Sequence, residues 1–526
     1  MIAKFILALV VLCLFKWLLT RSRQPPAPLP PGPRPMPIIG NINDLPPHNC
    51  QDWMHWYKHK ALYGPISSLT VFGQTLVILN EARLANELLE KRSAVHSSRP
   101  RMQFAKMAGW ENFISVQQYT DPRFRLTRKV LQQQIGSNAS VSRFDNIQDV
   151  ESRRFLLRVC NSPGDLIRHI RKEAGAIILK ITYGYTVEPH SRDPLVDLAD
   201  KAMAEFAESI PSGTWMVDLV PILKHLPAWC PGAGFVRTAR AYKETVTEMS
   251  SKPYLFVKQQ MLQHGAQPSV LSSLLSDSLV QAGSEEENVM KWSTAAMYAG
   301  GADTTVSTIT SFFLAMMLYP EAQKRAQAEI DSIVGTDRLP DYEDRDNLPY
   351  VNALVKELLR WHPVAPMAAA HMSIQDDMCE GYFIPRGSLI LPNVWSFTHD
   401  PAVYPEPSVF KPERFIESPE HPAEPDPRYL SFGFGRRVCP GRNLAVSNVF
   451  LTVARCLAVF DVTHVVRDGK KVSIEPNFSP GAISHPMPFE VSIKPRSEEH
   501  ERIIRSVEKE HPWEKSQAEE LRNLQS

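Results

Sequence analysis

The sequence predicts a mainly α-helical protein with small β-sheets, in which one large domain follows an N-terminal membrane anchor. Long apolar-rich runs with helix start and stop signals dominate residues 284–363. The body of the chain contains neither an internal repeat nor a long low-complexity linker. The 44 prolines against 24 glycines predict many rigid turns and extended connections between helices.

Charge and composition exclude several classes of protein. The 526 residues carry 58 Lys+Arg against 57 Asp+Glu, a net charge of +1, so no basic surface for nucleic acid is expected. Hydrophobic residues at 43% and charged residues at 22% exclude a disordered chain and a protein with many membrane spans. The seven cysteines are scattered without CxxC spacing, which argues against a zinc ribbon, a redox dithiol or a disulfide framework.

Residues 1–20 are apolar apart from two lysines and a terminal threonine, and we interpret them as a single transmembrane anchor. The alternative is a cleaved signal peptide, whose apolar core residues 5–15 would supply. No small-x-small cleavage site follows, and Arg21 and Arg23 favour holding that side of the membrane in the cytosol.

Residues 21–40 are rich in proline and predict a stiff, extended hinge, because proline lacks a backbone donor and restricts its neighbour. Residues 41–495 form the predicted catalytic domain. Residues 496–526 are highly charged, and we expect a solvated helix or a frayed end there.

A long helix is predicted from Ser284 to Tyr319. Ser284 and Glu287 fit a capping box, an apolar-rich run follows, and Pro320 ends it. At 1.5 Å per residue such a helix is roughly 50 Å long and would cross a whole domain.

The segment 299–305, with the sequence AGGADTT, interrupts the strong helical pattern near its middle. Two glycines and two threonines each cost up to ~1 kcal/mol in a helix. A local conflict of this kind indicates a functional site. The alternative is that the glycines allow another helix to approach closely.

A second helix is predicted between Pro349 and Pro363, with Glu357 and Arg360 three residues apart on it. Taken alone, such a pair is usually exposed and contributes only a few tenths of a kcal/mol. Residues 382–385 and 388–392 read as short strands around a turn.

The most specific stretch is residues 432–445, where Cys439 lies in a glycine-containing turn just before a predicted helix. The helix N-terminus and the neighbouring Arg436 and Arg437 would both lower the pKa of the thiol. A thiolate there suits a nucleophile or, because no histidine lies nearby in sequence, an axial ligand to haem iron. The alternative is a buried structural cysteine.

Together these motifs give the chain a close resemblance to microsomal cytochromes P450, the haem-thiolate monooxygenases. They occur in the family's order over about residues 30–495. The matching segments are PPGPRPMPIIGN at 30–41, GGADTT at 300–305, ELLR at 357–360, PERF at 412–415 and FGFGRRVCPG at 432–441.

The resemblance implies that Cys439 ligates the iron of haem b as a thiolate. It places Thr304 and Asp303 over the opposite face, where they would handle dioxygen and protons, with Gly300 and Gly301 leaving room for dioxygen. In the cysteine loop, Phe432 would shield the sulfur, and Gly433 and Gly435 would let the loop pass close beneath the macrocycle.

The resemblance also implies a buried charge network in which Arg414 joins Glu357 and Arg360. Removal of one member of such a network leaves an unpaired buried charge and costs ~3–5 kcal/mol.

The haem propionates would bind Arg437, Arg128 and His371. The chain departs from the family pattern at Phe124, where a tryptophan is usual. Phenylalanine cannot donate the indole hydrogen bond, so weaker haem retention is expected.

Substrate would contact residues 101–116, 206–217, 297–302 and 366–370 and the turn near Ile483. Their small apolar side chains suit a lipophilic molecule such as a terpenoid or polyketide of fungal secondary metabolism. Core packing is the alternative for all of these residues.

The resemblance thus implies insertion of one oxygen atom from dioxygen into that substrate. The chain has no flavin or nicotinamide fingerprint, so electrons would come from NADPH-cytochrome P450 reductase. The enzyme would be anchored in membrane lipid of the endoplasmic reticulum and face the cytosol. Two alternatives stay open: a haem-thiolate isomerase or dehydratase that uses no dioxygen, against which Asp303 and Thr304 argue, and a non-catalytic haem-binding membrane protein.

Overall fold

The computed structural model describes residues 26–47, 49–211, 214–263, 265–276, 280–419 and 421–524. The predicted anchor at residues 1–20 lies outside these ranges. Within them, no helix combines the length and hydropathy needed to cross a bilayer.

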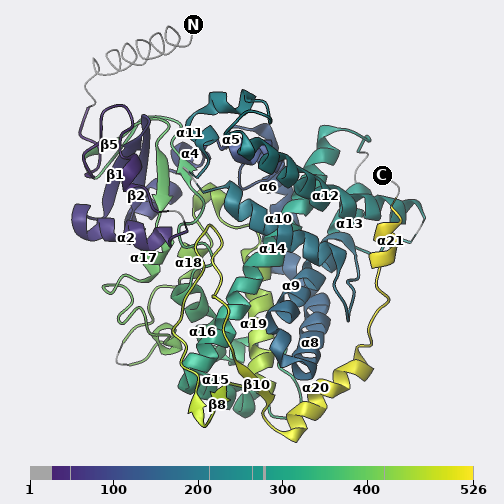
Figure 1. The fold of residues 1–526 in the computed structure, drawn as a ribbon. Helices are drawn as coiled ribbons and strands as arrows, with labels where there is room; N and C mark the ends of the chain where they lie inside the picture. Colours follow the sequence, from purple (N-terminus) through teal and green to yellow (C-terminus); the bar gives the residue numbers. More distant parts are fainter. Residues whose placement is uncertain are drawn as a thin grey trace.

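Helices fill most of the molecule, and the small sheets lie toward its edges (Figure 1). The described helices are α2 (Asp52–Tyr63), α3 (Ala82–Ala85), α4 (Ser93–His96), α5 (Gln103–Met107), α6 (Pro122–Ile135), α7 (Asn138–Val141), α8 (Asp145–Asn161), α9 (Leu166–Tyr183), α10 (Pro194–Ser209), α11 (Met216–Leu219), α12 (Gly234–Leu262), α13 (Val270–Ser276), α14 (Glu285–Leu318), α15 (Pro320–Ile333), α16 (Pro349–Trp361), α17 (Val394–Thr398), α18 (Arg428–Ser431), α19 (Arg442–Val459), α20 (Glu498–Glu510) and α21 (Ala518–Arg522).

The largest sheet has the strand order β1-β2-β6-β3, with β2 and β6 parallel and the other neighbours antiparallel. The strands of this sheet are β1 (Ile66–Val71), β2 (Gln74–Leu79), β6 (Leu389–Pro392) and β3 (His371–Met372). Two-stranded sheets pair β4 (Asp377–Cys379) with β5 (Tyr382–Ile384), β7 (Phe460–Thr463) with β10 (Ser492–Pro495), and β8 (Val466–Arg467) with β9 (Lys470–Lys471). Both predicted strands near residues 382–392 are therefore confirmed, although they pair with different partners.

The proline-rich segment packs on the body over its described part. The Ser68 hydroxyl donates to the Pro30 carbonyl at 2.6 Å, and the Ser68 N–H donates to the Pro31 carbonyl at 2.8 Å. A Cβ on Gly32 would lie 1.8 Å from the Ser68 carbonyl oxygen, so only glycine allows this approach. The segment is extended as expected, but residues 26–40 lie along β1 instead of standing clear of the domain.

The long central helix is confirmed as α14. The Ser284 hydroxyl accepts the N–H of Glu287 at 3.2 Å, while the Glu287 carboxylate accepts the N–H of Gly283 at 2.6 Å. Pro320 ends the helix and begins α15. Local capping signals alone therefore locate both ends of this helix.

Gly301 is the point at which α14 and α9 approach most tightly. A Cβ there would lie 2.7 Å from Cγ1 of Ile178, whereas a Cβ on the adjacent Gly300 would meet no atom within 4 Å. The proposed role for Gly301 in leaving room for dioxygen is therefore wrong, and the alternative of helix packing holds for it. Gly300 keeps its exposed surface within an otherwise buried stretch of helix.

We expect Gly301→Ala to destabilise the protein by about 1–3 kcal/mol, because Ile178 is buried and has little room to move. Gly300→Ala is the matched control and should be neutral or stabilising, since alanine is the better helix former. Urea unfolding of the single variants and of Gly301→Ala with Ile178→Ala measures the coupling. Equal stabilities for the two glycine variants would contradict the assignment.

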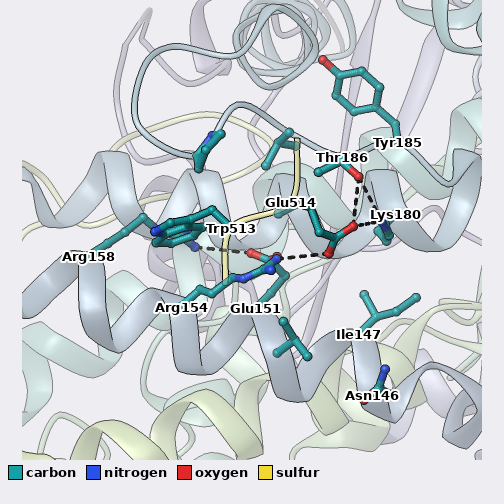
Figure 2. Close-up of a pocket in the computed structure, with 14 residues that line it drawn as sticks. Asn146, Ile147, Glu151, Arg154, Arg158, Lys180, Tyr185, Thr186, Trp513 and Glu514 are labelled. Carbon is teal, nitrogen blue, oxygen red and sulfur yellow. Dashed lines mark hydrogen bonds and ion pairs between the residues drawn. The ribbon is translucent and has the colours of Figure 1, made fainter. Parts of the chain in front are cut away.

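The C-terminal tail contains a helix with a solvent-exposed face, as predicted, but its other face packs on the body and the tail is not frayed. Helix α20 buries Ile504 and Val507. Beyond it, Trp513 lies against α8, with the Arg154 and Arg158 guanidinium groups 5.3 and 5.5 Å from its ring (Figure 2). The chain then runs along the outside of the helices to α21, as the yellow segment of Figure 1 shows.

Trp513 closes a cavity of about 90 Å³ between α8, α9 and residues 185–189. Glu514 forms ion pairs at its rim, 2.6 Å from Lys180 and 3.4 Å from Arg154 (Figure 2). Inside, the Arg158 guanidinium has no hydrogen-bond partner among the described residues and lies 3.6 Å from Glu151. The tail thus covers a buried charge with an aromatic ring.

Trp513→Ala should lower the free energy of unfolding by about 1–3 kcal/mol, because it removes half-buried ring packing and two cation–π contacts. Trp229→Ala is the control, since that indole is 80% exposed and should contribute little. Urea unfolding and limited proteolysis of the tail are the measurements. Identical results for the two variants would show that the tail is not held by Trp513.

Candidate functional site

The loop at residues 432–441 places Cys439 directly before α19. Gly433 and Gly435 have φ angles of 77° and 53°, and the Cys439 N–H donates to the Phe432 carbonyl at 2.8 Å. A Cβ on Gly435 would lie 2.2 Å from the Leu89 carbonyl oxygen. Glycine at 435 therefore serves the packing of this loop against residues 86–91 as well as its turn.

The pKa of the Cys439 thiol is shifted upward, opposite to the direction predicted from the sequence. Burial raises its pKa, and the opposing influences are the Gly441 N–H and the charges of Arg128 and Arg442. Despite this desolvation, Cys439 retains accessible surface, which places it beside internal space. A thiolate at this position therefore needs a bound metal to hold it.

Arg436 and Arg437 are not among the charges that lower the pKa of the Cys439 thiol, contrary to the sequence prediction. The Arg437 guanidinium donates to the carbonyls of Ser97, Ile114 and Gln117 at 2.7–3.0 Å. Arg436 is exposed and lies 5.3 Å from the Tyr119 ring. Arg437 therefore ties the cysteine loop to residues 97–117.

Buried positive charges without acidic partners gather beside the cysteine loop. Among the described residues, no carboxylate lies within ion-pair distance of Arg99, Arg128 or Arg437. Burial lowers the pKa of Arg99 to about 10, and burial together with Arg99 and Arg128 lowers that of Arg437 to about 8. Uncompensated buried cations of this kind indicate an anionic ligand.

His371 on β3 belongs to the same cluster. Burial and then the charge of Arg99 hold its pKa well below its usual range, and Nδ1 donates to the His96 carbonyl at 2.8 Å. Its Nε2 has no partner within the described part of the chain. Sequence reasoning named Arg128, Arg437 and His371 but missed Arg99, which no local pattern distinguishes from an ordinary surface arginine.

Phe124, the departure from the family's tryptophan, is buried with the Arg437 guanidinium 3.9 Å above its ring. The ring thus supports the arginine by stacking, although it supplies no hydrogen bond of its own. Arg128, on the same helix α6, donates to the Val438 carbonyl in the cysteine loop. The expectation of weaker haem retention stays a prediction.

On α14, Thr304 keeps accessible surface within the buried helix, as Gly300 does one turn earlier. Its hydroxyl donates to the Gly300 carbonyl at 2.7 Å, so the Oγ lone pairs are available as acceptors. The Asp303 carboxylate lies 3.1 Å from Nε2 of His485, a residue that sequence reasoning did not single out.

Glu357, Arg360 and Arg414 form one buried network, so the exposed-pair interpretation does not hold. Glu357 binds Arg360 through two contacts of 2.7 and 2.8 Å and Arg414 at 3.2 Å. Glu424, which the sequence did not reveal, lies 2.9 Å from Arg414 and balances the charge. The network joins α16 to η8 (Pro412–Phe415) behind the cysteine loop.

The aromatic residues of the predicted substrate segments pack against one another. Trp110 and Phe206 meet edge-to-face at 4.7 Å, and Phe104 stacks on Trp215 at 3.6 Å. Met297 is also buried. Core packing, the alternative, therefore describes these five side chains.

Unlike these aromatic residues, several smaller apolar residues of the predicted substrate segments keep accessible surface. Met367, Ala368 and Ala369 are half-buried, as is Ile483. With Gly300 and Thr304 they are candidates for the lining of the internal space.

A haem fits these residues. Its iron would hold Cys439 as a thiolate, and its two propionates would supply the carboxylates that Arg99, Arg128 and Arg437 lack. The observation that supports the fit is that these three arginines have no carboxylate partner among the described residues, and two of them, Arg99 and Arg128, lie outside the cysteine motif.

Comparisons with known proteins agree with this fit. The family model described as Cytochrome P450 matches residues 30–493. The chain is 51% identical over 525 residues to "Cytochrome P450 monooxygenase ppsD" of Aspergillus oryzae, covering 99% of both chains. It is 42% identical over 508 residues to "O-methylsterigmatocystin oxidoreductase" of Aspergillus flavus, covering 96% of this chain and 95% of the relative. A zebra fish cytochrome P450 solved with abiraterone shares the fold, with a TM-score of 0.67, 23% identity and coverage of 85% and 100% of the two chains.

Proposed function

The chain belongs to the cytochrome P450 family, and from that premise we propose that it oxidises a lipophilic small molecule of fungal secondary metabolism, a terpenoid or a polyketide. The family makes the chain an oxygen-inserting oxidoreductase with a haem-thiolate cofactor. The observation that carries the assignment to this chain's own residues is the cluster of three arginines beside Cys439 that bind backbone carbonyls and have no carboxylate partner among the described residues.

Each residue of the site has a definite task in this reaction. When bound, the haem supplies the activation of dioxygen. Cys439 would hold the iron as a thiolate, and Arg99, Arg128 and Arg437 would hold the propionates. The Thr304 Oγ can accept a hydrogen bond, and the neighbouring Asp303 carboxylate can hold or pass on a proton.

The substrate class is inferred from the side chains of the site that keep accessible surface. Met367, Ala368, Ala369 and Ile483 offer apolar contact and no charge, which favours a molecule without ionised groups. The relative named O-methylsterigmatocystin oxidoreductase carries a substrate name of the same broad kind.

Electrons are proposed to come from an NADPH-cytochrome P450 reductase that docks near the cysteine loop. Arg125, Lys129, Arg436 and Arg442 are exposed around this loop. A hollow of about 720 Å³ beside it is lined by Arg345, Lys356 and Arg428 in addition to Arg442, and by two aspartates. Such a surface complements an acidic docking face on a flavoprotein.

The proposed location is the membrane of the endoplasmic reticulum, with the domain in the cytosol. Ile38, Ile222 and Trp229 are 71–80% exposed, and Met216 on α11 is 50% exposed. Leu219 at the end of α11 packs against the apolar cluster of the large sheet, so these side chains lie in neighbouring parts of the fold. Exposed apolar residues of this kind suit contact with lipid.

The test is turnover by the full chain with a cytochrome P450 reductase, NADPH and oxygen-18 gas. A panel of neutral terpenoids and polyketides serves as substrate, with mass spectrometry as the readout. Gain of one oxygen-18 atom, dependent on NADPH, is the expected result. A product that forms without NADPH would favour an isomerase or dehydratase, and haem binding without any product would favour a non-catalytic protein.

A further inference from the structure

The Asp303 carboxylate forms an ion pair with His485, which lies in the segment before β10. Its Oδ1 lies 3.1 Å from Nε2 of His485, whose side chain is 26% exposed while that of Asp303 is 12% exposed. The imidazole is therefore better placed than the carboxylate to meet solvent. Since a carboxylate accepts hydrogen bonds, Nε2 is the nitrogen that donates.

The backbone around His485 is held on several sides. The His485 N–H donates to the Ser479 hydroxyl at 2.9 Å, and the Ser479 N–H donates to the His485 carbonyl at 2.8 Å. The neighbouring Ser484 accepts from the Ser307 hydroxyl of α14 at 2.6 Å and donates its N–H to the Val364 carbonyl at 2.9 Å. The loop thus presents the imidazole to α14 in one position.

A second acid, Asp200 on α10, faces the same pair. Burial raises its pKa to about 6; Arg171 opposes this, while Asp303 raises and His485 lowers the same pKa. Arg171 lies 3.4 Å from Asp200, and its side chain is 43% exposed. The ion-pair partner of Asp200 is therefore Arg171, while Asp303 and His485 influence it only electrostatically.

The other titratable neighbour of His485 is His362, on the far side of Ser484. Its Nε2 lies 3.0 Å from the Ser484 hydroxyl, and burial followed by the charge of His485 lowers its pKa to about 3. His362 is therefore neutral under ordinary conditions.

We propose that His485 is the residue through which protons from solvent reach Asp303 and Thr304. The proposal rests on the monooxygenase function above, in which RH + O₂ + 2 e⁻ + 2 H⁺ gives ROH + H₂O. The imidazole can accept a proton at Nδ1 and release one from Nε2 to the Asp303 carboxylate, 3.1 Å away. His485 is thus a proton-relay residue that does not touch the substrate.

The test compares His485→Gln with the wild type on the panel compound that the wild type converts fastest. Glutamine can keep a hydrogen bond to Asp303 but cannot pass on a proton. NADPH-driven turnover should fall by about 10- to 100-fold, with a larger solvent isotope effect, because a slowed proton transfer becomes rate-limiting.

Hydrogen peroxide separates the relay from a structural role, because RH + H₂O₂ gives ROH + H₂O with no proton from solvent. His485→Gln should keep the wild-type peroxide-driven rate and the carbon monoxide spectrum. His464→Gln, a change in the β7–β8 connection, is the matched control and should alter nothing.

Two results would overturn the relay. One is wild-type NADPH turnover and isotope effect in His485→Gln; the other is loss of the peroxide-driven rate as well, which would make His485 a purely structural residue. If instead the wild type oxidises no panel compound under either condition, the proposed function fails and not the relay alone.

Discussion

Replacement of Cys439 by alanine is expected to abolish both the reduced carbon monoxide difference band and all NADPH-driven product. The Cys439 thiolate is the residue that would bind the iron, and its loop is held in place by two glycines and by Arg437. The measurement is a carbon monoxide spectrum of purified protein together with haem content per chain.

Cys456→Ala supplies the matched control for this variant. Cys456 is fully buried within α19, the helix that follows Cys439, and burial likewise raises its pKa. Its replacement should cost some stability through a small cavity but leave the spectrum unchanged. A carbon monoxide band retained by Cys439→Ala would remove the ligand assignment.

Glu357→Gln is expected to lower the free energy of unfolding by about 3–5 kcal/mol. The carboxylate is completely buried and meets both Arg360 and Arg414, which would be left as unpaired cations. Glu424 alone cannot neutralise both. The measurement is urea unfolding of the haem-loaded protein, followed by the haem absorbance and by far-ultraviolet circular dichroism.

An exposed pair of the same spacing provides the comparison. Glu499 and Arg502 lie three residues apart on α20, with side chains 53% and 71% exposed. Glu499→Gln should cost less than about 0.5 kcal/mol. If the two substitutions cost the same, the buried network does not hold the fold together.

The parts of the fold that could be predicted from the sequence are those that depend on residues close together in the chain. Ser284 and Pro320 mark the ends of α14 because capping and proline chemistry act within one helical turn. The position of Cys439 before a helix follows from its own loop in the same way.

The parts that could not be predicted depend on contacts between distant segments. Arg99 and His485 have partners on distant segments of the chain, Ala369 and Asp303, and Glu424 reaches Arg414 across an irregular loop, so no periodicity marks any of the three. The pKa of Cys439 was predicted in the wrong direction because adjacent arginines were assumed to face it, whereas Arg437 faces three carbonyls of residues 97–117. The two glycines of α14 show the same limit, since only the position of Ile178 separates their roles.

The tail that covers Arg158 has a consequence for biosynthesis. Helix α8 leaves the ribosome long before residues 498–522, by roughly tens of seconds at ~5–20 residues per second. During that interval Arg158 lacks the indole of Trp513 that later lies against it. Arg158 therefore stays uncovered until the segment that contains Trp513 has been synthesised. We expect chaperones to bind the ribosome-attached chain during this interval.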